Sequence, residues 1–234
     1  MQSMTLGSML VLHRMLGTWQ QRVTKFIALN DFCRRKFIEG GLPGERIVVK
    51  PNFVDFGALA ERERSGFLFV GRLSMEKGIE VLRNAAMLLS PAELVVVGSG
   101  PAEFLLTGIP GVELLGARTK KEVGAQMSKT LALIFPSVCF ETFGLVIIEA
   151  FAHGTPVIAS HIGVVTDLVE DGVTGLLFAP GNDAELAEKI TWARSHPEEM
   201  AIMGRRARLK FEEYFTPDKN YDQLLAIYEE ARLC

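Results

Sequence analysis

The chain has 234 residues, and its 25 lysines and arginines are nearly balanced by 28 aspartates and glutamates, which gives a formal net charge of −3. Hydrophobic residues make up 48% and charged residues 23%, an ordinary globular composition that excludes a disordered or coiled-coil protein. The mildly acidic balance argues against a protein that binds nucleic acid through its net charge. The length allows one large domain or one and a half.

The cysteines and the apolar runs indicate the cellular compartment. Cys33, Cys139 and Cys234 are widely spaced and form no CxxC pair, which is typical of reduced thiols and not of a disulfide framework or a zinc site. No apolar run reaches the roughly 20 residues of a membrane span. The N-terminus also lacks the pattern of a signal peptide. We therefore expect a cytoplasmic protein without a metal site.

The first 56 residues predict one βαβ unit that follows an apolar helix. Helices are expected over residues 4–16 and 32–39, and strands over 24–29 and 46–50. The first helix places Met9 and Leu12 on one apolar stripe, and such a helix normally packs against something. A single βαβ unit is too small to bury a core of its own. Residues 1–56 are therefore expected to need a partner, either further sequence or another chain.

From residue 57 to 210, short apolar runs alternate with helical patterns. The runs FLFVG, LVVVG, VELLG, LALIFPS and PVIAS lack polar alternation, which is typical of strands covered on both faces of a parallel sheet. The stretches between them predict helices, for example over 79–89, 120–127, 145–153 and 183–195. This succession predicts a Rossmann-like, doubly wound α/β domain over 57–210. A terminal helix begins at Pro217, and the segment 211–234 is expected to pack back toward the N-terminal part.

Two glycine-containing motifs follow the first two predicted strands of this domain. GRLSMEKG, residues 71–78, places Arg72 and Lys77 at a strand end, where ligands of open α/β sheets bind. A planar guanidinium and a point charge suit a diphosphate, although two solvated surface cations are the alternative. VVGSGP contains Gly98 and Gly100 but lacks the third glycine of a dinucleotide fingerprint. These two glycines either shape the floor of a ligand crevice or form a tight turn.

The third motif, PSVCFETFGLVIIEA over residues 136–150, carries two carboxylates around a predicted helix start. The helix is expected to open near Phe143 and Gly144, where free N–H groups and the helix dipole favour a phosphate. Glu141 precedes this opening, and Glu149 follows it by roughly 9 Å along the helix axis. This placement suits a nucleotide-sugar, with Glu141 on the sugar hydroxyls and Glu149 on the ribose. A helix-cap role is the alternative for Glu141.

Together these motifs, with HGTPVIAS and DGVTGLLF further on, resemble the donor-binding half of a GT-B glycosyltransferase of family 4. The resemblance covers nearly the whole chain, since residues 26–55 are similar to the end of that family's N-terminal domain and its linker. It implies a remnant of the acceptor domain over 1–56 and a donor domain over 57–210. The family's glycine-rich loop and its histidine near the donor sugar are missing, and none of His13, His153, His161 or His196 stands in a matching context.

The resemblance implies a retaining transferase that uses no cofactor and no metal, with a UDP-, GDP- or ADP-sugar as donor. Arg72 and Lys77 would hold the leaving diphosphate, Glu141 would contact the sugar, and Glu149 the ribose. The implied donor site comprises Gly71, Arg72, Lys77, Gly98, Gly100, Arg118, Glu141, Thr142, Phe143, Gly144, Leu145 and Glu149. The acceptor would be a glycan or a lipid-linked molecule, which allows peripheral contact with a membrane, and nucleic acid is not expected.

Because the acceptor domain is mostly absent, the chain alone is expected to transfer sugar weakly or not at all. The leading alternative is a non-catalytic nucleotide-sugar-binding subunit whose partner chain supplies the missing domain. An NAD-type oxidoreductase is disfavoured by the absent third glycine and by the lack of a ribose-binding acid after the second strand. An epimerase acting on nucleotide-sugars fits the position of Glu149 less well.

Overall fold

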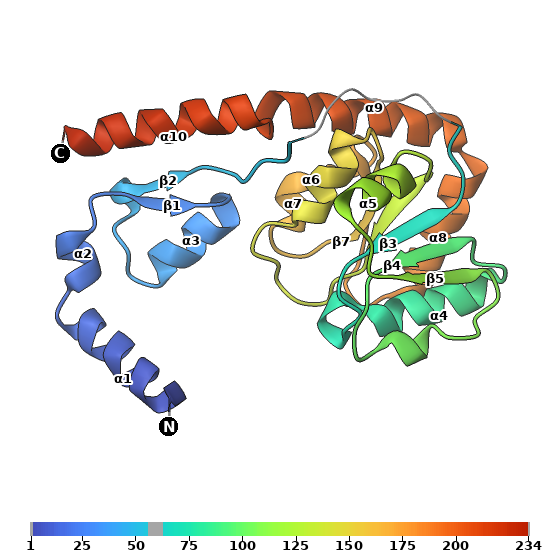
Figure 1. Ribbon diagram of the computed structural model, residues 1–234, viewed down its shortest axis with the longest axis horizontal. Coiled ribbons are helices and arrows are strands. Elements are labelled where there is room, and N and C mark those ends of the chain that lie inside the picture. The colour runs from blue at the N-terminus through green and yellow to red at the C-terminus, as the bar shows by residue number, and fades with distance from the viewer. Residues whose placement is uncertain (1, 56–62, 234) are drawn as a thin grey trace.

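The computed structural model describes residues 2–55 and 63–233, and it contains one large and one small parallel sheet (Figure 1). The large sheet has six strands in the order β5-β4-β3-β6-β7-β8, all parallel. They are β3 (Phe67–Val70), β4 (Leu94–Val97), β5 (Val112–Gly116), β6 (Ala132–Phe135), β7 (Val157–Ser160) and β8 (Gly175–Phe178). The Rossmann-like doubly wound sheet expected from the apolar runs is confirmed.

Helices cover both faces of the large sheet, which explains why its strands are apolar throughout. On one face lie α4 (Ile79–Leu89) and α8 (Asp183–Ser195), and on the other α5 (Lys120–Met127), α6 (Leu145–Ala152) and α7 (Val165–Leu168). The helix α9 (Pro197–Tyr214) contributes to both cores. Within β3, Phe67 and Phe69 enter the first core, whereas Leu68 between them enters the second, as the alternation of a strand requires.

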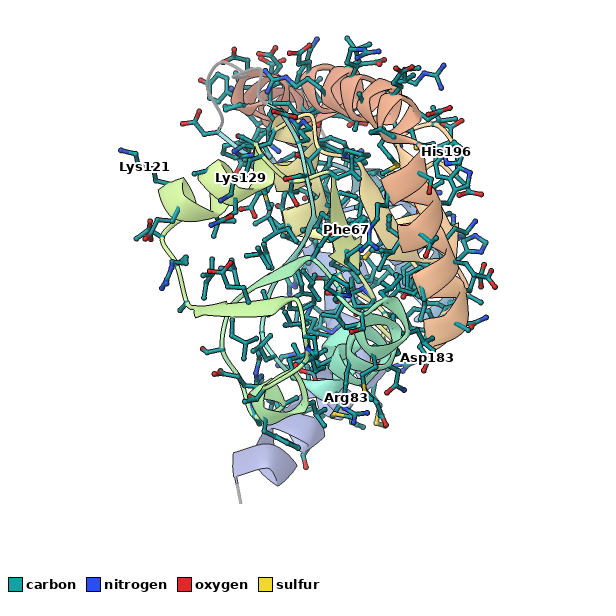
Figure 2. All side chains as sticks on the ribbon, turned by 90° about the vertical axis from the view of Figure 1, so that its right-hand side faces the viewer. Phe67, Arg83, Lys121, Lys129, Asp183 and His196 are labelled. Atoms are coloured by element: carbon teal, nitrogen blue, oxygen red, sulfur yellow. The ribbon has the colours of Figure 1, made fainter. Side chains whose placement is uncertain are left out.

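The order of the strands indicates where a ligand crevice is expected. The chain starts in the middle of the sheet with β3, adds β4 and β5 on one side, and then crosses to β6 on the other. The order therefore reverses between β3 and β6, and open α/β sheets bind ligands beyond the carboxyl ends of the strands at such a point. Val70 and Phe135 end these two strands. In Figure 2, Phe67 lies in the interior, whereas Lys121 of α5 points away from the domain.

The N-terminal segment forms the small sheet. Strands β1 (Phe26–Ala28) and β2 (Ile47–Val49) pair in parallel, joined by α3 (Asp31–Glu39) and a short 3-10 turn, Gly44–Arg46. Before them come α1 (Gln2–Met15) and α2 (Thr18–Arg22). The predicted βαβ unit is present, although each strand is shorter than expected. Apolar side chains of α1 and the turn after it remain exposed, among them Leu6, Met9, Leu12 and Leu16.

The terminal helix α10 (Pro217–Arg232) runs beside the N-terminal unit (Figure 1). Asn220 Nδ2 donates to the Pro51 carbonyl over 2.6 Å, and Lys25 Nζ pairs with Glu230 Oε1 at 2.7 Å. Both contacts join α10 to the N-terminal segment, toward which the segment 211–234 was expected to pack. The division into 1–56, 57–210 and 211–234 stays a prediction, and its first boundary falls at 56–62, outside the described residues.

Apart from the short 3-10 turns, four elements go beyond the predicted ones, namely α2, α7, β8 and α9. β8 follows the Asp171–Gly172 turn and completes one edge of the sheet, while α7 and α9 supply helical cover. β8, GLLF, is as long as β3 or β4, but it begins with a glycine and contains no β-branched residue, so its strand signal is weaker. In α9 the buried positions Met200, Met203, Ala207 and Phe211 recur every three or four residues, so a helical pattern was there to be found.

Candidate functional site

The loops that follow β3 and β6 approach each other closely because of a glycine. Gly78 has a φ of 73°, and a Cβ atom at this position would lie 1.9 Å from the carbonyl oxygen of Pro136. Only glycine allows both this backbone conformation and this contact. The Val138 N–H then donates to the Glu76 carbonyl over 3.1 Å. The loop with the predicted cations is thereby joined to the loop with the first predicted glutamate.

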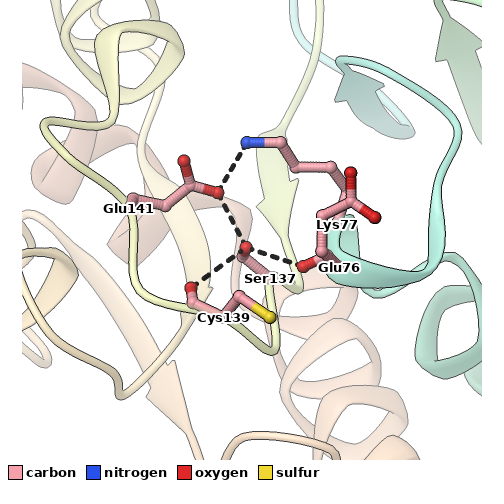
Figure 3. A network of polar contacts seen from close by, with 5 residues as sticks. All are labelled: Glu76, Lys77, Ser137, Cys139 and Glu141. Atoms are coloured by element: carbon pink, nitrogen blue, oxygen red, sulfur yellow. Dashed lines mark hydrogen bonds and ion pairs between the residues drawn. The ribbon is translucent and has the colours of Figure 1, made fainter. Parts of the chain in front are cut away.

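This junction places Lys77 beside Glu141, although the two residues are 64 positions apart (Figure 3). Lys77 Nζ lies 2.6 Å from Glu141 Oε1, and the two side chains are 30% and 16% exposed. The Ser137 hydroxyl also reaches Glu141 Oε1, at 2.7 Å, with the carbonyls of Glu76 at 3.0 Å and Cys139 at 3.4 Å as further acceptors. A hydroxyl has one proton, and the carboxylate is the strongest acceptor of the three. Glu141 is therefore held from two sides.

The first turn of α6 faces the same space. Its N-cap is Gly144, in the left-handed conformation with a φ of 81°, and no side chain caps the helix. The first backbone N–H groups of a helix have no partner within it, and the helix dipole is positive there. The helix begins at Leu145, the first residue of the predicted range 145–153, and Gly144 turns the chain just before it. The free backbone N–H groups at the start of α6 thus lie near Lys77 and Glu141.

A cavity of about 450 Å³ lies among these groups. Most of the predicted site residues line it, namely Gly71, Arg72, Lys77, Glu141, Thr142, Phe143, Gly144, Leu145 and Glu149. The Arg72 side chain is exposed and makes no hydrogen bond or ion pair within residues 2–55 and 63–233. Asn52 and Ser137 also line this cavity and were missed. Ser137 stands at the end of an apolar run, which was the available signal, whereas nothing in the sequence around Asn52 singles it out.

A second cavity of about 690 Å³ adjoins the first and shares Val70, Leu145 and Glu149 with it. It is lined by Phe53, Val54 and the helix α5, and it includes the predicted Arg118 together with Lys120 and Lys121. The second cavity is larger than the first, and its lining also contains the acidic residue Asp55. The two cavities together form an elongated site with Glu149 at their junction.

Glu149 is a carboxylate in a costly position. Burial raises its pKa above the ordinary 4.5, and the opposing charge of Lys120 only partly offsets this. Its carboxylate makes no hydrogen bond or ion pair with any residue that the structure describes. A half-buried charge without a partner destabilises the fold unless a ligand satisfies it. A polar ligand group in either cavity would therefore reduce the cost of burying this carboxylate.

Gly98 and Gly100 line neither cavity. A Cβ atom at Gly98 would lie 1.9 Å from the Gly71 carbonyl oxygen, and one at Gly100 would lie 2.3 Å from that of Leu73. Both glycines therefore let the segment after β4 pack beneath the loop that carries Arg72. These contacts favour the tight turn that was the alternative for the two glycines, and their part in the donor site stays a prediction.

His153 at the end of α6 is buried, and its Nδ1 lies 2.7 Å from the Glu149 carbonyl oxygen. It borders the second cavity. Burial lowers its pKa below the ordinary 6.5, and the charges of Arg64 and Arg208 add to this, whereas the hydrogen bond to Glu149 opposes it. These surroundings are typical of a structural histidine.

Stability is expected to fall as the pH drops below 6.5, the ordinary pKa of histidine. The unfolded chain then takes up a proton at His153 more readily than the folded chain, so its contribution is complete above that pH and declines below it. Urea midpoints measured on both sides of this pH will check the sign. His153→Gln is expected to reduce the slope, and an unchanged slope in the variant would contradict the assignment to His153.

Neither a cluster of possible metal ligands nor a membrane-spanning helix is found in the part of the chain that the structure describes. No group of three or more histidine, cysteine, aspartate or glutamate side chains there could hold a metal ion. No described helix is long and apolar enough to cross a membrane. Cys33 and Cys139 are free thiols, and Cys234 lies outside the described residues.

Comparisons with known proteins agree with this architecture. The chain is 32% identical over 166 residues to D-rhamnosyltransferase WbpZ of Pseudomonas aeruginosa, an alignment that covers 66% of the chain and 43% of that protein. It is 29% identical over 229 residues to alpha-D-kanosaminyltransferase of Streptomyces kanamyceticus, which covers 87% of the chain and 58% of that protein. The chain thus spans about half the length of these curated relatives.

The fold is also that of solved structures. The crystal structure of Anabaena HepE in complex with UDP matches with a TM-score of 0.81 and 23% identity, over 90% of this chain and 65% of that one. A glycosyltransferase from Rickettsia africae matches with a TM-score of 0.80 and 20% identity, over 92% of this chain and 66% of that one. The family model described as "Glycosyl transferases group 1" matches residues 64–196, more than half of the chain. With its Rossmann-like half of a GT-B fold, the chain belongs to the group 1 glycosyl transferases.

Proposed function

We propose that the chain binds a nucleotide-diphosphate sugar and forms the donor half of a retaining glycosyltransferase. The observation that carries this proposal is the pair of adjoining cavities with the carboxylate of Glu149 at their junction. The first cavity contains cations and the uncapped start of α6, and the second is larger. Cavities of this size are typical of small-molecule sites. The residues that line the two cavities suggest where the diphosphate, the sugar and the nucleoside of the ligand lie.

The diphosphate is proposed to lie between the loop after β3 and the first turn of α6. Arg72 and Lys77 supply positive charge on one side, and the uncapped N-terminus of α6 supplies N–H donors on the other. When the bond to the sugar breaks, negative charge develops on the departing diphosphate. Preorganised cations and helix N–H groups stabilise such charge, which is the role expected of a metal ion in metal-dependent enzymes.

The sugar is proposed to lie against Glu141, and the nucleoside in the second cavity. Only one oxygen of Glu141 accepts from Lys77 and Ser137, which leaves Oε2 for a sugar hydroxyl. Glu149 at the junction would accept from the ribose hydroxyls and so gain the partner that it lacks. Arg118 lines the second cavity and would border the base.

The relatives favour a nucleotide-sugar ligand but do not select the sugar. The titles of the solved structures of Anabaena HepE name UDP and UDP-glucose as its ligands, so uridine compounds are the first probes for this chain. The curated relatives are named for the transfer of different sugars, including D-rhamnose and kanosamine. We propose a glycan or a lipid-linked molecule as the acceptor, with peripheral membrane contact in the second case.

A non-catalytic donor-binding subunit is the second candidate. It is favoured by the exposed apolar side chains of α1 and the turn after it, such as Leu12 at 55% and Leu16 at 60% exposure. A helix of this kind usually packs against a partner, and that partner could bring the acceptor site. In this case the chain would bind donors with full affinity but transfer sugar only in the presence of the partner.

A thermal-shift panel tests the proposed function. UDP-, GDP- and ADP-sugars, each with the free nucleoside diphosphate, are compared with NAD⁺ as the control for a dinucleotide site. At a concentration of about 100 times the Kd, a binding ligand is expected to raise the melting temperature by roughly 5 °C or more. A shift with NAD⁺ alone would favour the oxidoreductase reading, and no shift with any compound would overturn donor binding.

A further inference from the structure

Asn30 connects the small sheet to the loop that carries Glu141. It follows β1 and caps α3, where its Oδ1 accepts a hydrogen bond from the Cys33 N–H over 2.7 Å. Its Nδ2 at the same time donates to the Thr142 carbonyl over 2.9 Å, across 112 positions of sequence. The residue is buried, with 7% of its surface exposed. Both ends of one amide are therefore used, one within the N-terminal unit and one on the site loop.

Residues of the N-terminal unit contact the site loop on both sides of Glu141. Thr142 directly follows this glutamate, and its carbonyl also lies 3.4 Å from the Cys33 thiol. Phe140 directly precedes it, and its ring lies 5.1 Å from that of Phe32 in the first turn of α3. The small sheet makes no strand pairing with the large one. The N-terminal unit, at the start of α3, thus contacts the loop around Glu141, which belongs to the large domain.

Capping alone does not explain an asparagine at position 30. Serine, aspartate and asparagine cap helices about equally well, because each offers an oxygen acceptor. Asparagine differs in its amide, which adds two N–H donors to the acceptor. Here one of these donors reaches Thr142, a residue that lines the first cavity.

We propose that Asn30 is a positioning residue that sets the place of Glu141 for the donor sugar. This inference rests on the proposed function and adds to it a route by which the N-terminal unit acts on the sugar end of the site. Lys77 and Ser137 hold the carboxylate from within the large domain. Asn30 holds the backbone beside it from the other unit. Movement of α3 would shift the loop and thus the sugar contact, while the diphosphate and nucleoside contacts stay.

The test compares Asn30→Ser with the wild-type chain by calorimetry. The probes are the nucleotide-sugar that gives the largest shift in the thermal panel and its free nucleoside diphosphate. Serine keeps the cap but its hydroxyl is too short to bond Thr142 as well, so the fold is expected to survive. The affinity for the nucleotide-sugar is expected to fall about fivefold, the usual effect of one hydrogen bond, while that for the nucleoside diphosphate stays.

Asn182 provides the matched control, since it caps α8 with a 3.1 Å bond from the Glu185 N–H and lines neither cavity. Asn182→Ser is expected to leave both affinities unchanged. Asn30→Asp keeps the cap and turns a carboxylate toward the Thr142 carbonyl, so it is expected to weaken sugar binding further. Equal losses for both probes, no loss, or unfolding of both Asn30 variants would overturn the positioning role. Absence of binding to the wild-type chain would overturn the proposed function itself.

Discussion

Replacement of Lys77 by alanine is expected to weaken the binding of a nucleoside diphosphate by about 10- to 100-fold. A hydrogen bond to a charged group contributes about 1.5–3 kcal/mol, which corresponds to this range of dissociation constants. The variant also removes the cation beside Glu141, 2.6 Å away, so the carboxylate would then repel the diphosphate. Calorimetry with the nucleoside diphosphate that shifts the melting temperature most gives the measurement.

Lys129 is the matched control for this experiment. It is an exposed lysine of the same domain, but it lines a small cavity at the amino ends of β3 and β4, opposite the proposed site. Lys129→Ala changes the net charge as Lys77→Ala does and is expected to leave the affinity unchanged. If the two variants bind the nucleotide equally well, the diphosphate does not lie at Lys77.

Replacement of Glu149 by glutamine is expected to weaken nucleotide binding at least about tenfold, or about 1.4 kcal/mol, while it stabilises the protein. The loss follows from the ribose hydroxyls, which would meet an amide in place of a carboxylate. The gain follows from burial, which raises the pKa of Glu149 and so disfavours its charged form in the folded chain. Removal of this charge is expected to raise the free energy of unfolding by roughly 1 kcal/mol at neutral pH.

The stabilising effect has a defined pH dependence. As the pH falls through the raised pKa toward the ordinary value of 4.5, the wild-type carboxyl becomes neutral in the folded chain as well. The advantage of the glutamine variant is therefore expected to be largest at neutral pH and to vanish below that value. Urea unfolding at pH values on both sides measures it, with Glu113→Gln on the exposed edge strand as control. A loss of stability in Glu149→Gln at neutral pH would contradict the absence of a partner.

Much of the fold could be predicted because both faces of the large sheet are covered. Strands of that kind are continuous apolar runs, which are easily recognised in a sequence. The predicted bounds of the helices α4, α5 and α8 agree with the structure to the residue, as at Ile79–Leu89. β8 was not predicted because GLLF begins with a glycine and contains no β-branched residue, unlike the other strands of the sheet. The start of α6 at Leu145 agrees with the predicted range 145–153, since Gly144 marks the turn before the helix, and its end at Ala152 comes one residue before the predicted one.

The sequence indicated which residues lie at one edge of the sheet, but not the contacts between them. Strand ends indicated Arg72, Lys77 and Glu141, because parallel strands bring their carboxyl ends to one edge. The 2.6 Å pairing of Lys77 with Glu141 depends on the close approach of Gly78 to Pro136. The contact between Asn30 and Thr142 joins two separate sheets. The sequence left both alternatives open for Gly98, because a glycine that meets backbone and a glycine that meets a ligand have the same sequence signature.

The most direct measurement is a crystal structure of the chain with its preferred nucleoside diphosphate. The diphosphate oxygens are predicted to lie about 3 Å from Lys77 Nζ and from backbone nitrogens in the first turn of α6, with a ribose hydroxyl on Glu149. The nucleoside is predicted to fill the cavity of about 690 Å³ beside α5. A nucleotide bound elsewhere, or one whose diphosphate contacts neither Lys77 nor α6, would contradict the proposed donor site.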